Sequence, residues 1–76
     1  MDELIAYLAR SLVDRPDDVS VGLEQREDAI VYRLRVAAED RGKVIGKQGR
    51  IARSLRTVVR AGGIRSGQRM LLEIVE

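Results

Sequence analysis

A chain of 76 residues suffices for one small domain, and the absence of cysteine and histidine removes disulfides, zinc fingers and thiol or imidazole catalysis. No segment reaches the roughly 20 apolar residues of a membrane span, and the acidic amphipathic start is unlike a signal peptide, so we expect a cytoplasmic protein without a membrane partner. The formal net charge of +2 hides an asymmetry, because residues 41–69 contain nine Arg or Lys and no acid. A basic segment of this length indicates a polyanionic partner.

The first half of the chain predicts a helix followed by a β-hairpin. Pro16 should end the helix after Asp14. Alternating apolar residues predict a short strand over 19–23 and a longer strand over 30–36, joined by the polar turn 25–28. The apolar residues at helical spacing that predict the first helix are Leu4, Ile5, Leu8 and Leu12.

The second half predicts a short helix, a long helix and a final strand. Asp40 is placed to cap a helix over 41–45, which Gly46 can end in the left-handed conformation. An amphipathic helix is predicted from Arg50 to about Ala61, where the pair Gly62-Gly63 ends it. Its apolar side should carry Ile51, Leu55, Val58 and Val59, and its basic side Arg50, Arg53, Arg56 and Arg60.

After a loop over 64–67, alternation at Met70, Leu72 and Ile74 predicts the last strand. The element order α-β-β-α-α-β over residues 1–76 predicts a single α+β domain. We expect a three-stranded mixed sheet with three helices on one face. The crossover through two helices should make the last strand parallel to the strand over 30–36.

The stretch Gly46-Lys47-Gln48-Gly49 joins the two helices through only two residues. Glycine at both corners allows positive φ and the close approach of another backbone. The amides that open the long helix are predicted to be unpaired and to form an anion site suited to phosphate. The cations expected around this site are Arg41, Lys43, Lys47, Arg50 and Arg53, and the residues expected to line an apolar strip for bases are Val44 and Ile45.

The segment Val44-Ile45-Gly46-Lys47-Gln48-Gly49 matches the (V/I)-I-G-x-x-G signature of KH domains. The element order of the whole chain resembles the type II KH arrangement, and a lone domain of this size resembles the small bacterial KH proteins of the KhpA type. One departure concerns the position three residues after the second glycine, where many KH domains have Ile. This chain has Ala52 there and Ile51 one residue earlier.

The resemblance implies an RNA-binding protein that is not an enzyme and needs no cofactor or metal. The GxxG residues 46–49 would clamp single-stranded RNA, Val44 and Ile45 would form a groove wall, and the loop 62–67 with Arg65 would form the opposite rim. By the same resemblance the protein would be an RNA chaperone or post-transcriptional regulator, linked to cell shape and envelope growth, with a KhpB-type KH partner. A homodimer is also expected, because a 76-residue core is thin.

Other classes fit the residues less well. A P-loop would need four residues between its glycines and a hydroxyl where Gln48 stands. Tyr7 and Tyr32 are predicted to pack in the core rather than stack on bases, and the acidic pairs 17–18 and 27–28 are predicted to be turn residues rather than catalytic groups. Duplex DNA suits two short helices poorly. The main alternative is a protein-interaction module whose basic helix holds an acidic partner.

Overall fold

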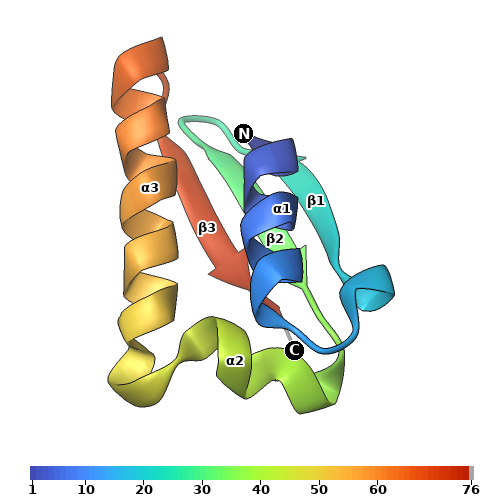
Figure 1. Ribbon diagram of the computed structural model, residues 1–76. Coiled ribbons are helices and arrows are strands. Elements are labelled where there is room, and N and C mark those ends of the chain that lie inside the picture. The colour runs from blue at the N-terminus through green and yellow to red at the C-terminus, as the bar shows by residue number, and fades with distance from the viewer. Residues whose placement is uncertain (76) are drawn as a thin grey trace.

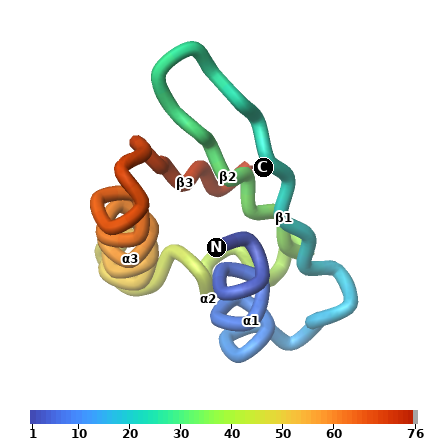
Figure 2. The backbone as a smooth tube through the Cα atoms, turned by 90° about the horizontal axis from the view of Figure 1, so that it is seen from above, coloured from blue at the N-terminus to red at the C-terminus, as the bar shows by residue number. Residues whose placement is uncertain are grey.

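A computed structural model describes residues 1–75 and arranges them in two layers, a β-sheet and a layer of helices (Figure 1). The elements are α1 (Asp2–Leu12), β1 (Ser20–Gln25), β2 (Ile30–Arg35), α2 (Arg41–Ile45), α3 (Arg50–Ser66) and β3 (Met70–Ile74), with short 3-10 turns at Pro16–Asp18, Ala38–Asp40 and Lys47–Gly49. All three α-helices lie on one side of the sheet (Figure 2). None of the helices within residues 1–75 is both long and apolar enough to cross a membrane.

The sheet has the strand order β1-β2-β3. β1 and β2 form an antiparallel hairpin in which Leu23 lies opposite Tyr32. β2 and β3 are parallel, with Tyr32 opposite Leu72. The predicted mixed sheet, its single helical layer and the parallel last strand are therefore confirmed. The helical crossover through α2 and α3 is what returns the chain to the same end of the sheet and makes the parallel pairing feasible.

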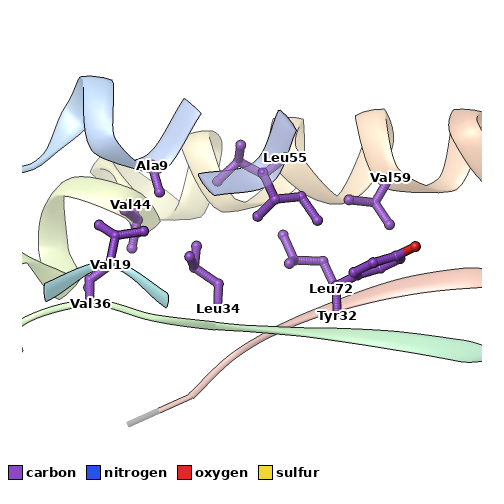
Figure 3. Packing of buried hydrophobic residues seen from close by; sticks show 10 residues of the cluster. Ala9, Val19, Tyr32, Leu34, Val36, Val44, Leu55, Val59 and Leu72 are labelled. Carbon is purple, nitrogen blue, oxygen red and sulfur yellow. The ribbon is translucent and has the colours of Figure 1, made fainter. Parts of the chain in front are cut away.

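The core lies between the inward side of β2 and the three helices (Figure 3). Leu34 occupies its centre and is completely buried, and Tyr32 and Val36 continue the alternation on either side. On α3 the buried residues Ala52, Leu55 and Val59 follow i, i+3 and i+7 spacing and therefore lie on one side of the helix. The buried helix residues that close the cluster are Ile5, Ala9, Val44, Leu55 and Val59.

Several apolar side chains lie elsewhere than their pattern predicted, including Leu4 and Leu12 of α1, which are 44% and 37% exposed. Tyr7 is 66% exposed, because it stands two positions from both Ile5 and Ala9 and two helical steps rotate it about 200° away from the core face. Leu23 is exposed on the edge strand β1, where the helices cover the sheet incompletely. Val58 is also exposed, one helical step from the buried Val59.

The prediction that Gly62-Gly63 ends the long helix is wrong, because α3 continues through both glycines to Ser66. The glycines serve close packing instead of termination. A Cβ on Gly63 would lie 2.5 Å from the carbonyl oxygen of Gln68, where the chain turns back into β3. A Cβ on Gly62 would meet the methyl end of Met1. The predicted loop over 62–67 is therefore mostly the last turn of α3.

Candidate nucleic-acid interface

The GxxG loop between α2 and α3 has a backbone conformation that depends on its two glycines. Gly46 has φ 77° and ψ 173°, a region that is essentially restricted to glycine. Its φ is positive as expected, but its extended ψ is not the left-handed helical conformation that was predicted. Any Cβ there would also lie 2.7 Å from Cγ1 of Ile51. Gly49 takes the left-handed conformation at φ 74° and ψ 16°, and it does so directly before α3.

The amides at the start of α3 are less available than the sequence predicted. The Gly49 N–H donates to the Gly46 carbonyl at 3.1 Å, and the Arg50 N–H donates to the Lys47 carbonyl. A 3-10 turn over Lys47–Gly49 thus satisfies two of the donors assigned to an anion. A phosphate at this loop would therefore have to be held mainly by side-chain charge, assisted by the positive end of the α3 dipole.

Two arginines of α3 lie directly against the loop. Arg50 Nη2 donates to the Gln48 side-chain oxygen at 3.4 Å, and Arg53 Nη2 reaches the Gln48 carbonyl at 3.5 Å. Lys47 and Gln48 themselves are exposed. Gln48 has φ 58°, in the left-handed region that residues other than glycine adopt only rarely. The structure therefore brings together Lys47, Arg50 and Arg53 around one exposed backbone segment.

Lys43 and Arg41, which the sequence assigned to the same site, have other surroundings. The Lys43 ammonium forms an ion pair with Asp14 and lies 3.6 Å from Asp40 Oδ1. The hydrogen bond with Asp14 raises the pKa of Lys43 above its usual value, so the lysine is fully charged but already compensated. Arg41 is half-buried, and its Nε has no hydrogen-bond partner among residues 1–75.

The apolar wall beside the loop also differs from the prediction. Val44 is 0% exposed and belongs to the core, so it cannot touch a base. Ile45 is 40% exposed and remains available. Ile51 packs against Gly46, a contact that the helical wheel did not reveal because it predicted only which side of the helix Ile51 lies on. Ala52 is buried where many KH domains have Ile, so the core under the loop is built from a smaller side chain.

Asp40 anchors the helix that leads into the loop. It is 1% exposed and occupies the position before α2, but its side chain makes no capping hydrogen bond there. Instead Oδ2 accepts the backbone N–H of Arg15 at 3.0 Å. Because α1 ends at Leu12, two residues before the predicted boundary, the chain can cross to this contact. The carboxylate thereby ties the α1–β1 connection to the five-residue helix α2.

The remaining cations of the basic segment form a row along α3. Arg53, Arg56 and Arg60 follow i, i+3, i+7 spacing and are all exposed. Within residues 1–75, the ion pairs of the basic segment involve only Lys43 and Arg69, so seven of its nine cations have no acid partner. Arg65 is separated from the loop, since sixteen residues of α3 at 1.5 Å each place it about 24 Å from Gly49.

An α+β domain with a helix–GxxG–helix unit between two parallel strands is a KH domain, a class of nucleic-acid-binding module. A family model described as the KhpA/KhpB KH domain matches residues 2–74. The chain therefore belongs to the KhpA/KhpB KH-domain family, as the sequence resemblance indicated.

Similar proteins extend over nearly the whole chain. The RNA-binding protein KhpA of Treponema pallidum is 55% identical over 75 residues, which cover 99% of this chain and 94% of that protein. The RNA-binding protein KhpA of Clostridium perfringens is 49% identical over 75 residues, 99% of this chain and 100% of that protein. A crystal structure of Era from Aquifex aeolicus shares the fold, with a TM-score of 0.66 and 18% identity over 96% of this chain and 28% of the Era chain. The names of the KhpA relatives describe RNA binding and no reaction.

Proposed function

We propose that this protein binds single-stranded RNA by gripping the sugar-phosphate backbone with the GxxG loop 46–49. The observation that carries the proposal is the combination of an exposed positive-φ loop with Lys47, Arg50 and Arg53, none of which has an acid partner among residues 1–75. KH modules clamp about four backbone nucleotides with such a loop. The similarity to proteins named RNA-binding protein KhpA supports RNA over other polyanions.

A single strand fits this surface better than a duplex. α2 has only five residues and the loop links it tightly to α3, an arrangement that suits a splayed strand gripped at the loop better than a helix inserted into a major groove. The exposed side chain of Ile45 next to Gly46 offers an apolar contact for a splayed base. The proposed binding residues are Gly46, Lys47, Gln48, Gly49, Arg50, Arg53 and Ile45, with Arg41 and Arg65 at greater distance along α2 and α3.

Fluorescence anisotropy with labelled single-stranded RNA, an RNA duplex and polyglutamate tests this proposal. Three to five phosphate contacts, at about −0.7 each, give a slope of log affinity against log salt of roughly −2 to −3.5 for the single strand. Polyglutamate represents an acidic protein partner and carries no phosphate. Equal affinity for polyglutamate and RNA, or a flat salt response with RNA, would overturn RNA binding in favour of the protein-interaction module.

Finer roles rest on the resemblance to KhpA-type proteins alone. They include RNA chaperoning or post-transcriptional regulation in the cytoplasm, a KhpB-type partner, and control of cell shape and envelope growth.

Self-association has physical support of its own, because Leu4 of α1 and Val58 of α3 leave apolar surface exposed. A homodimer would cover such surface and provide a second clamp for one RNA. Light scattering at tens of micromolar protein should give twice the monomer mass, and a monomer would contradict this part.

A further inference from the structure

An open hollow of about 670 Å³ lies between the last turns of α3 and the start of β3. Its wall is mainly apolar, and no acid lines it. Ile64 is 79% exposed at its margin, an unusual position for a large aliphatic side chain. The lining residues that matter here are Arg60, Ile64, Gln68, Arg69 and Met70.

The hollow lies well beyond the GxxG loop. Fourteen residues separate Gly49 from Gly63, which at 1.5 Å per helical residue is about 21 Å. The row Arg53, Arg56 and Arg60 runs along α3 between them, and Arg60 belongs to both the row and the hollow. None of the three has an acid partner within residues 1–75. A strand held at the loop therefore meets an uncompensated line of charge that leads to the hollow.

We propose that this hollow receives one nucleobase of the bound RNA, outside the segment held by the loop. The inference rests on the proposed RNA-binding function and adds a second contact point to it. Ile64 and Met70 supply an apolar surface for the face of a base, and the Arg60 guanidinium supplies a plane on which a base can stack. The Gln68 amide has both donors and an acceptor for a base edge.

The charge of the hollow favours a nucleotide over a second copy of this chain. Arg60 is unpaired among residues 1–75, and the only ion pair of Arg69 there is with exposed Asp28 at 3.5 Å, a contact that a phosphate can replace at little cost. A two-fold pairing through this surface would bring the same cations of a second copy against Arg60 and Arg69. A base with its phosphate matches both the apolar wall and the cations.

Ile64→Ser tests the hollow because it removes apolar surface and leaves every charge in place. Homo-oligomers of A, C and U, each four and ten nucleotides long, serve as probes at low salt. A tetramer occupies the loop, whereas a decamer can also reach the hollow. Ile64→Ser should bind every tetramer like the wild type and should bind at least one decamer about tenfold more weakly, equal to about 1.4 kcal/mol. Tyr7→Ser, which truncates an exposed side chain on α1, is the matched control and should change neither affinity.

Three results would overturn the proposal that the hollow receives a nucleobase. The first is wild-type affinity of Ile64→Ser for all decamers, and the second is an equal loss in Tyr7→Ser. The third is a lower molar mass of Ile64→Ser than of the wild type, which would assign the surface to a second copy. The loop is judged separately with Lys47→Asp/Gln48→Asp. If that variant binds tetramers like the wild type while Ile64→Ser binds a decamer more weakly, the base site in the hollow is supported and the proposal that the loop clamps RNA is wrong. If the wild type binds no RNA, both proposals are wrong.

Discussion

Replacing Lys47 and Gln48 by Asp separates the binding role of the GxxG loop from its structural role. Both side chains are exposed and neither contributes to the core. Gln48 has φ 58°, a conformation that Asp adopts more readily than most residues. Acids at the start of α3 also interact favourably with its dipole. We therefore expect the unfolding free energy to change by no more than about 0.5 kcal/mol, which is roughly 2–4 °C in melting temperature for a domain of this size.

RNA affinity should fall despite the unchanged fold. The variant loses the Lys47 charge and places two carboxylates where a phosphate must approach, beside Arg50 and Arg53. We expect at least a tenfold loss, or about 1.4 kcal/mol. The slope of log affinity against log salt should become shallower by about 0.7 for each phosphate that the variant no longer neutralises. Anisotropy titrations at three salt concentrations, with circular dichroism melting of the same samples, provide both measurements.

The control variant Arg10→Glu/Ser20→Glu lowers the formal charge by the same three units at exposed sites on α1 and β1. It should leave RNA affinity within about twofold, because long-range screening weakens charges that lie beyond a Debye length of about 10 Å. An equal loss in the control would mean that net charge rather than the loop governs binding. If the loop variant unfolds, the loop is structural; if it folds and binds like the wild type, the loop is not the clamp.

The remaining predictions concern stability. Gly63→Ala should lower the unfolding free energy by about 1–3 kcal/mol, since its Cβ would meet backbone atoms at 2.5–3.0 Å, whereas Gly42→Ala, with nothing within 4 Å, should be neutral or stabilising in thermal melts. Asp40→Ala should cost about 1–3 kcal/mol by removing the acceptor of a partly buried N–H, and Asp40→Asn should retain more stability; equal melting temperatures would contradict the anchor. The hydrogen bond from Arg26 lowers the pKa of Glu24 below 4.5, so its stabilising effect is present above pH 4.5 and is lost as pH falls through the lowered pKa. Denaturant titrations of Glu24→Gln should therefore show a flatter decline of stability in acid than the wild type.

Local patterns predicted much of this protein because they depend on residues close together in the chain. The alternation over 30–36 placed Tyr32, Leu34 and Val36 in the core, since successive strand residues point to opposite faces whatever packs on them. The loop 46–49 and the acid-free segment 41–69 were equally readable from the sequence. So was the parallel last strand, because a two-helix crossover returns the chain to its starting end.

Contacts between distant residues decided the rest. The charge of Lys43 is compensated by Asp14, 29 residues away, and no spacing rule anticipates that pair. Tyr7 is exposed because α1 packs on the sheet through Ile5 and Ala9, and which side of α1 packs depends on the shape of the surface that it contacts. Gly63 lies inside α3 because the chain passes close to it on its way into β3. The same return of the chain forms the hollow beside Ile64. Each of these features depends on which surfaces meet after folding, and that information lies in the packing of whole elements rather than in the order of neighbouring residues.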